Sequence, residues 1–300
     1  MQTSFFTKRP AFRLRLDIES VVAEFRGGIH ESIMSGLGLE FKGLRPYDTS
    51  DSPSVIDDFA SARVSEESEF EPMSRDYHPE RKISVFFAID GGKNMFIPPR
   101  KFEYASVLLW LFALSALDPE SRDLFRILFF GSDNVVDSGF ISAEESIEEF
   151  LAAWETTTLG GYDLTKTSDF FSYLGSLEIR DTLVVVVSDF SSGWEKELQS
   201  LRRLPLFENN IRMIFFALDA WRGFLPQSSG LLLHDPVGGL YRQFDMREGS
   251  DLDLMSQEAE KHLSNIEQRV RPLGVSFVRL GLISDPILAV RKELLRLGFE

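Results

Sequence analysis

The fold of this chain is decided by two stretches, ISVFFAID at residues 83–90 and TLVVVVSDF at residues 182–190. Each contains an unbroken apolar run that leads to an aspartate, Asp90 in the first and Asp189 in the second. Strands that are apolar on both faces are typical of a parallel sheet covered by helices on its two sides. The two stretches therefore predict buried parallel strands, each with a carboxylate at its carboxyl end.

Further apolar runs alternate with amphipathic segments from residue 81 to the end of the chain. Another helix is predicted to end near residue 177, with Asp163 or Thr165 as its N-cap. This alternation predicts an α/β fold with a doubly wound, mostly parallel sheet, whose ligands bind beyond the carboxyl ends of the strands. The other predicted elements are strands at residues 124–131, 211–219 and 275–280, a hairpin at residues 231–246, and helices at residues 101–117, 142–155, 195–204 and 251–270, with a closing helix opened by Asp285-Pro286.

The first 80 residues lack this alternation and contain a Gly-rich stretch, GLGLEFKGLRPYDTSDS at residues 36–52. We therefore predict two parts. Residues 1–80 form an N-terminal segment that packs on the sheet, and residues 81–300 form the α/β domain.

Composition and charge exclude several classes of protein. Lys and Arg number 32 against 47 Asp and Glu, and the resulting net charge of −15 argues against nucleic acid as a partner. The absence of Cys excludes disulfides, zinc–thiolate sites and a Cys nucleophile. The longest apolar run, VLLWLFALSAL at residues 107–117, is shorter than the roughly 20 residues of a membrane-spanning helix. We therefore expect a core helix there, no transmembrane segment and a cytoplasmic protein.

The motifs of common enzymes are missing from the sequence. It has neither a Walker A sequence nor the GxSxG elbow of serine hydrolases. Its four histidines are scattered and show no metal-ligand spacing, so we interpret them as structural. No catalytic residue is predicted, and we expect the protein not to be an enzyme.

Three stretches together resemble the metal-ion-dependent adhesion site of the von Willebrand factor A family: AIDGGKNM at residues 88–95, LGGYDL at residues 159–164 and VVVVSDF at residues 184–190. That family's pattern is Asp-x-Ser-x-Ser after the first strand, a Thr in a following loop and an Asp after a later strand. The resemblance implies a sheet of von Willebrand factor A type. Magnesium prefers six hard oxygen ligands, which the site and an acidic residue of the partner supply together.

The match to this metal site is partial. Asp90 and Asp189 correspond to the family's two aspartates. Asn94 stands in place of a serine and can offer its side-chain carbonyl oxygen as a ligand. Thr165 lies one turn from the position of the expected threonine. These four are the candidate metal ligands of a degenerate site. We expect no resident cofactor, with Mg²⁺ as the alternative.

The remaining loop residues are predicted to serve partner binding. Gly92 and Tyr162 stand where the family has hydroxyl ligands, and Lys93 and Asp163 follow them in the two loops. Because two carboxylates without a cation repel each other, we hypothesise that the Lys93 ammonium neutralises them in place of a metal. The alternative is that Asp90 and Asp189 only cap the helices that follow their strands.

The N-terminal part resembles the signature of a bacterial family, domain of unknown function 58. Its pattern reads approximately S…G.G.EF.GLR.Y..GDD.R.IDW..SAR, and here the GDD glycine, the following Arg and the Trp are replaced by Ser50, Ser54 and Asp58. The stretches HDPVGGLYRQFD and VSFVRLGLISDPILAVRKELL also resemble that family, so the likeness covers nearly the whole chain. The retained signature residues are Ser35, Gly36, Gly38, Glu40, Phe41, Gly43, Leu44, Arg45, Tyr47, Asp51, Ile56, Asp57, Ser61, Ala62 and Arg63.

The resemblance implies an interaction protein that acts as an adaptor between a MoxR-type AAA+ ATPase and an unknown client protein. Two other functions stay open: a metal-dependent hydrolase or phosphatase using Asp90, and a structural binding module without an ATPase partner. The signature residues Glu40, Arg45, Tyr47, Asp57 and Arg63 are predicted to form a polar network that fastens the N-terminal segment to the sheet, because buried charges require partners. Direct contact with the partner is the alternative.

Overall fold

A computed structural model of the chain divides it into two compact units, residues 29–81 and residues 1–28 with 82–300. Each unit is described by itself. The structure describes residues 41–47, 56–57, 59–61, 72–77, 83–96, 98, 100–118, 123–131, 134–159, 169–191, 194–219, 230–234, 241–245, 251–282 and 285–296.

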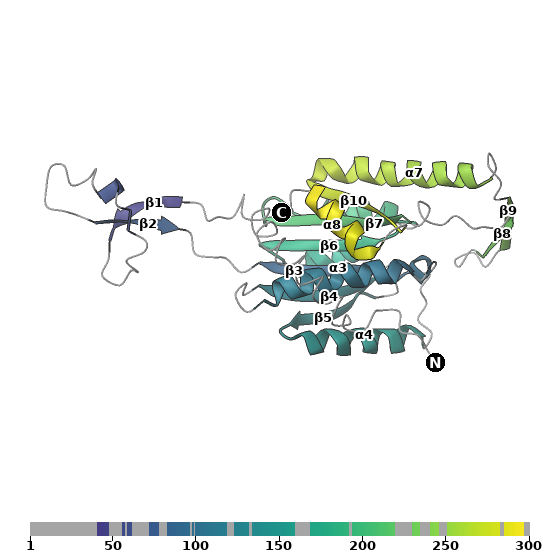
Figure 1. Ribbon diagram of the computed structural model, residues 1–300, viewed down its shortest axis with the longest axis horizontal. Helices are drawn as coiled ribbons and strands as arrows, with labels where there is room; N and C mark the ends of the chain where they lie inside the picture. The colour runs from purple at the N-terminus through teal and green to yellow at the C-terminus, as the bar shows by residue number, and fades with distance from the viewer. Residues whose placement is uncertain are drawn as a thin grey trace. The chain divides into compact units, whose positions relative to one another are not determined.

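The large unit is built on a six-stranded sheet whose strand order is β10-β7-β6-β3-β4-β5 (Figure 1). Every neighbouring pair is parallel except β4 and β5, which are antiparallel. This arrangement confirms the predicted α/β fold with a mostly parallel sheet. The strands are β3 (Ser84–Asp90), β4 (Leu124–Phe130), β5 (Val136–Ile141), β6 (Thr182–Ser188), β7 (Ile211–Asp219) and β10 (Val275–Gly281).

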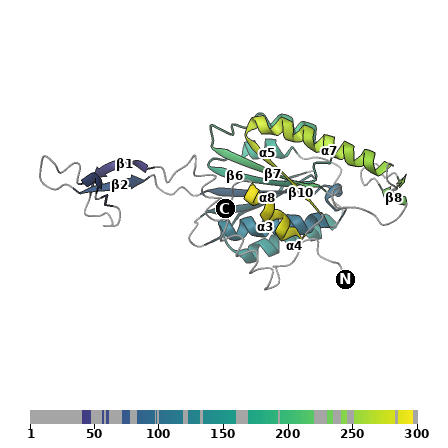
Figure 2. The same ribbon diagram turned by 45° about the horizontal axis from the view of Figure 1, so that its top comes forward.

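Helices cover both faces of this sheet. Apolar residues of α5, α6 and α7 pack with one face of β3, β6 and β7 in a single buried cluster. On the other face, Phe87 packs against Phe112 of α3, and Phe129 stacks on Trp154 of α4. Helix α8 contacts α3 on this side (Figures 1 and 2). The helices are α3 (Arg100–Ala116), α4 (Glu144–Leu159), α5 (Phe170–Ser176), α6 (Trp194–Leu201), α7 (Asp251–Val270) and α8 (Pro286–Arg296), with the short 3₁₀ helices η2 (Lys93–Phe96) and η3 (Arg271–Leu273).

Burial explains why the two deciding stretches form central strands. All seven residues of β6 are buried, and in β3 only the two end residues are partly exposed. The predicted core helix at residues 107–117 is also confirmed, because almost all of α3 is buried against the sheet and its neighbours. Of the helices among the described residues, none combines the length and the apolar character needed to cross a membrane.

The strand order places a topological switch between β3 and β6. From β3 the chain proceeds to β4 and β5 on one side, and then returns to β6, β7 and β10 on the other. At such a point the connections leave the two strands in opposite directions, which opens the sheet's carboxyl edge to a ligand. The strands that flank the switch are the two that end in Asp90 and lead into Asp189.

Two details differ from the sequence prediction. The edge strand β5 was not predicted, and its Asp137 accepts two hydrogen bonds from the Arg126 guanidinium of β4. The N-cap of α5 is Asp169, whose side chain accepts from the Ser172 N–H, so the predicted caps Asp163 and Thr165 are wrong for this helix. The predicted hairpin is present as the antiparallel pair β8 (Gly230–His234) and β9 (Tyr241–Asp245).

The small unit contains an antiparallel pair, β1 (Phe41–Pro46) and β2 (Met73–Tyr77). Asp57 organises the turn beside it: its carboxylate accepts from the Ala60 N–H at 3.0 Å, and its own N–H donates to the Met73 carbonyl at 2.8 Å. The buried Ser61 hydroxyl accepts from the Met73 N–H at 2.8 Å. These signature residues therefore tie the short helical turn to β2.

Candidate functional site

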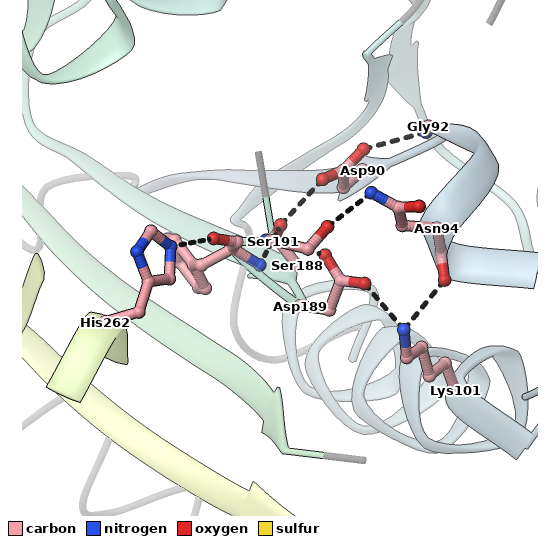
Figure 3. Close-up of polar contacts among 9 residues, drawn as sticks. Asp90, Gly92, Asn94, Lys101, Ser188, Asp189, Ser191 and His262 are labelled. Atoms are coloured by element: carbon pink, nitrogen blue, oxygen red, sulfur yellow. Dashed lines mark hydrogen bonds and ion pairs between the residues drawn. The ribbon is translucent and has the colours of Figure 1, made fainter. Parts of the chain in front are cut away.

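The two aspartates predicted from the sequence meet at the carboxyl edge of the sheet. Asp90 is the last residue of β3, and Asp189 directly follows β6. Because β3 and β6 pair in parallel with Ile89 opposite Val187, Asp90 lies level with Ser188. The Ser188 hydroxyl donates to Oδ2 of Asp90 at 2.6 Å across this pair (Figure 3).

The Asp90 carboxylate is held by both neighbouring segments. Its Oδ1 accepts the Gly92 N–H at 2.8 Å, and its Oδ2 accepts the Ser188 hydroxyl. Burial raises the pKa of Asp90 to about 6, and the negative charge of Asp189 adds to the shift, whereas the Ser188 and Gly92 hydrogen bonds and Lys101 oppose it. Asp90 thus titrates closer to neutral pH than an ordinary aspartate.

Glycines make room for this carboxylate. Gly131, directly after β4, has φ +90°, and a Cβ there would lie 2.6 Å from Oδ1 of Asp90. A Cβ at Gly92 would lie 2.9 Å from the same oxygen. Such distances are shorter than real Cβ contacts. The close turn after β3 therefore explains why a glycine stands at position 92, where the von Willebrand factor A pattern has a serine.

The Asp189 carboxylate is paired with a buried lysine that the sequence analysis did not select. Lys101, the second residue of α3, donates from Nζ to Oδ2 of Asp189 at 2.6 Å and to the Asn94 carbonyl at 2.7 Å (Figure 3). Only 6% of the Lys101 side chain and 7% of the Asp189 side chain are exposed. The pair is therefore a desolvated ion pair, located at the carboxyl edge of the sheet.

A second set of bonds joins the loops that follow β3 and β6. The Asn94 side-chain amide donates to the Ser191 hydroxyl at 2.6 Å, and the Ser191 N–H donates to Oδ1 of Asp189 at 3.0 Å. In this way η2 and the loop after β6 hold each other in place. Asp90 and Asp189 each accept the N–H of the residue two positions later in the chain, as an aspartate does in a local turn.

The residue after Asp189 is held in a left-handed conformation. Phe190 has φ +54°, which costs free energy for a residue that is not glycine. Its N–H donates to the Ser188 hydroxyl at 2.9 Å, and its ring is fully buried against Trp194 and Phe277. The carbonyl of Phe190 lies 2.7 Å from Nε2 of His262 on α7, so this nitrogen carries the proton because a carbonyl only accepts. Anchors on both sides thus fix the turn that aims Asp189.

The predicted site residues fall into three groups. The structure brings Asp90, Gly92, Asn94 and Asp189 together. The backbone of Lys93 lies in η2, but its side chain is outside the described residues, as are Tyr162, Asp163 and Thr165, so their predicted roles stay predictions.

Several of the signature residues predicted to form a polar network also lie outside the described residues. Glu40 and Arg63 lie outside the described residues, and of Arg45 only the backbone in β1 is described. Tyr47 donates its N–H to the Pro72 carbonyl at 2.8 Å, and Asp57 forms the turn given above. A network that joins these residues to the sheet stays a prediction.

Lys101, Ser188, Ser191 and His262 are the residues of the site that sequence reasoning missed. The two serines lie within two residues of Asp189 in the sequence, so their position beside this aspartate could have indicated that they belong to the site. Lys101 gave a weaker signal: a cation at the N-terminal end of a helix is unfavourable toward the helix dipole, which points to an acidic partner elsewhere in the fold.

The described residues of the candidate metal set do not fit Mg²⁺ as they are arranged. Magnesium requires a near-octahedral set of oxygen ligands. Here the Lys101 ammonium lies 2.6 Å from Oδ2 of Asp189, where a divalent cation would meet repulsion. Within the described part of the chain, no group of three or more His, Cys, Asp or Glu residues is arranged to hold a metal ion.

Comparisons with known proteins leave the family open. No protein-family profile matches the chain, and no curated protein matches it. The crystal structure of the conserved hypothetical protein BatB from Bacteroides thetaiotaomicron is 15% identical with a TM-score of 0.39, and the match covers 73% of this chain and 100% of that one. An uncharacterized membrane spanning protein from Vibrio fischeri is 11% identical with a TM-score of 0.18, over 72% of this chain and 98% of that one. Neither likeness carries an argument about function.

Proposed function

We propose that the chain is a non-enzymatic adaptor of von Willebrand factor A type, related to the domain of unknown function 58 family. In this proposal it acts in the cytoplasm and couples a MoxR-type AAA+ ATPase to a client protein through the carboxyl edge of its sheet. The sequence resemblance supplies the identity of the ATPase partner. The site supports the role of the edge in binding.

One observation carries the proposal: Asp90 and Asp189 converge at the topological switch, and every one of their oxygens is already hydrogen-bonded by the protein. These bonds fix the orientation of both carboxylates, while each oxygen keeps a second lone pair for a bound group. A binding surface needs groups that are fixed before the partner arrives, because ordering them during binding would weaken the complex. The bonds among η2, α3 and the loop after β6 provide such preorganisation.

Affinity capture tests the proposal with two matched substitutions. Ser191 is exposed at the carboxyl edge, whereas Ser176 is exposed at the end of α5, six residues before β6 begins and hence at the opposite edge of the sheet. Ser191→Arg adds a long cation to the proposed docking edge and removes the hydroxyl that accepts the Asn94 amide. Ser176→Arg adds the same group at the control position, where the lost hydroxyl donates to the Tyr173 carbonyl.

The immobilised wild-type chain is expected to retain a MoxR-type AAA+ ATPase from a lysate of the source organism, identified by mass spectrometry. The Ser191→Arg variant is expected to retain at least about tenfold less, as one lost or repelled contact of 1.4 kcal/mol would cause, and the Ser176→Arg variant the wild-type amount. Equal retention by all three chains, or no AAA+ ATPase among the retained proteins, would reject the proposed function.

A hydrolase is the second candidate, and the raised pKa of Asp90 favours it. A carboxylate with a pKa of about 6 resembles the general acids and bases of many active sites. The distinguishing assay is turnover of a panel of phosphate and carboxylic esters, with and without divalent cations. A hydrolase would show a rate that Asp90→Asn removes, whereas an adaptor would show none above background. A binding module without an ATPase partner would show neither turnover nor ATPase capture.

A further inference from the structure

We propose that the ammonium of Lys101 is the resident cation of the carboxyl edge, so that this edge binds its partner without a divalent metal ion. The first half of the proposal concerns only the described residues. The second half rests on the proposed function, because it assumes that the edge is a docking surface. The experiments below separate the two.

The geometry places the ammonium where a cation of a carboxylate site would lie. Nζ of Lys101 contacts Oδ2 of Asp189 at 2.6 Å and the Asn94 carbonyl oxygen at 2.7 Å. These two oxygens come from the loops after β6 and β3, which are the segments that flank the topological switch. One ammonium therefore joins both loops, as a metal ion with ligands from two strands would do (Figure 3).

Burial and helix electrostatics argue that this placement is specific. Lysine is almost never as buried as Lys101 unless it is paired, because the charge loses its hydration. Lys101 also lies in the first turn of α3, where the partial positive charge of the helix end opposes a cation. Both the loss of hydration and the helix end therefore destabilise the charge of Lys101. The negative charge of Asp189, with Asp90 beside it, compensates for these two effects.

The other ion pairs of the described residues lack this combination. The pair between Arg269 and Glu195 has the same contact distance, 2.6 Å, but the Glu195 side chain is mostly exposed. The Arg126–Asp137 pair joins β4 and β5 near one side of the sheet and involves no strand end at the switch. Lys101 and Asp189 alone among these join the two loops of the candidate site by a buried contact.

The proposal predicts that removing the ammonium creates a metal site. Without Lys101, the oxygens of Asp189 and the Asn94 carbonyl face a cavity of the size of the lost side chain, with Asp90 nearby as a second negative charge. Hard oxygen ligands of this kind favour Mg²⁺ and Mn²⁺. The wild-type chain should therefore bind these ions weakly, and Lys101→Ala should bind them through Asp189.

Calorimetric titration with Mn²⁺ and Mg²⁺ tests the assignment of Lys101 on four chains: wild type, Lys101→Ala, Asp189→Asn, and the double variant Lys101→Ala/Asp189→Asn. Wild type is expected to show no saturable binding up to about 10 mM, and Lys101→Ala is expected to bind at least about tenfold more tightly. The double variant is expected to lose the gained binding. Saturable wild-type binding that Asp189→Asn abolishes would overturn the proposal, and so would the failure of a folded Lys101→Ala chain to gain any binding.

A thermal measurement keeps the assignment testable if the alanine variant unfolds at the assay temperature. Lys101→Gln removes the charge, keeps a polar side chain, and leaves an amide oxygen that can serve as a further hard ligand for the ion. Its melting temperature is expected to fall below that of wild type and to rise on addition of Mn²⁺, whereas the wild-type melting temperature should not respond. A wild-type chain that Mn²⁺ stabilises as much as the variant would overturn the assignment.

The second half of the proposal is tested by repeating the ATPase capture in EDTA and in excess Mg²⁺. Equal retention in both buffers is expected, and loss of the captured ATPase in EDTA would overturn metal-independent docking. Should Ser191→Arg leave capture unchanged, the proposed docking edge fails, while the metal titrations still decide whether Lys101 is the resident cation.

Discussion

The buried pair of Lys101 and Asp189 gives the sharpest stability prediction. Both side chains are more than nine-tenths buried and their charged atoms lie 2.6 Å apart. Removing one partner of such a pair leaves an uncompensated charge in the protein and typically costs about 3–5 kcal/mol of unfolding free energy. Replacing both partners removes the charge as well, so its cost is smaller than the sum of the two single costs.

The experiment is a double-mutant cycle of Lys101→Met, Asp189→Asn and both together. Urea unfolding can be followed by tryptophan fluorescence, because Trp154 and Trp194 are buried and lose their packing on unfolding. We expect each single variant to lose about 3 kcal/mol or more, with a coupling free energy of about 2–3 kcal/mol in favour of the pair.

A matched cycle of Arg269→Met and Glu195→Gln serves as the control. That pair has the same 2.6 Å contact but a mostly exposed carboxylate, so water screens it and its coupling should be far smaller. If the Lys101 and Asp189 costs simply add, the reasoning that assigns a specific charge interaction to this pair is refuted.

Three further predictions concern groups around the site. Burial raises the pKa of Glu197 from 4.5 to about 7 although it accepts the N–H groups of Phe170 and Phe171, so its native state binds the proton more tightly than the unfolded chain. The contribution of protonated Glu197 to the free energy of unfolding should therefore be complete below about pH 4.5, and it should fall by up to about 3 kcal/mol as the pH rises through 7. Urea unfolding at pH 5.5 and 8 measures this fall, and Glu197→Gln should reduce it. An equal loss of unfolding free energy between the two pH values in wild type and variant would contradict the assignment. Gly131→Ala should cost about 2 kcal/mol more than the control Gly139→Ala, because both positions have positive φ but only at Gly131 would the new Cβ meet the Asp90 carboxylate, and equal melting temperatures would reject this. His262→Ala should speed amide hydrogen exchange at Phe190 and Ser191 while leaving β6 protected, since it removes the donor to the Phe190 carbonyl; unchanged exchange would show that the ring packing alone holds the turn.

The central part of the fold could be predicted because burial determines it residue by residue. The continuous apolar runs of β3 and β6 can lie only between two helical layers, and the aspartates at their ends then share one edge of the sheet. The edge strand β5 was missed because it contains Asp137, Ser138 and Gly139 in a row, a run of small and polar residues that is typical of a loop, although all three are partly buried. Their role depends on partners in β4: the Ser138 hydroxyl accepts the Ile127 N–H at 2.9 Å, and Asp137 binds Arg126.

The sequence predicted those parts of the site whose residues are close together in the chain, and it did not predict contacts between distant residues. Asp90, Gly92 and Asn94 are neighbours in the chain, so their pattern was visible. The partner of Asp189 is 88 residues away, and the position of Lys101 at a helix N-terminus indicates an acidic partner without identifying which one. The need for a positive charge followed from the two carboxylates, whereas its source depends on how α3 packs against the sheet.

The central claim is that an ammonium, not a metal ion, occupies the edge where β3 and β6 end. Paramagnetic broadening by Mn²⁺ in a ¹⁵N-labelled wild-type chain tests it most directly, because broadening falls off steeply with distance from a bound ion. The amide signals of Gly92, Asn94 and Ser191 should then broaden no more than those of exposed acidic segments such as α4. Selective broadening of these three signals, lost in Asp189→Asn, would contradict the claim.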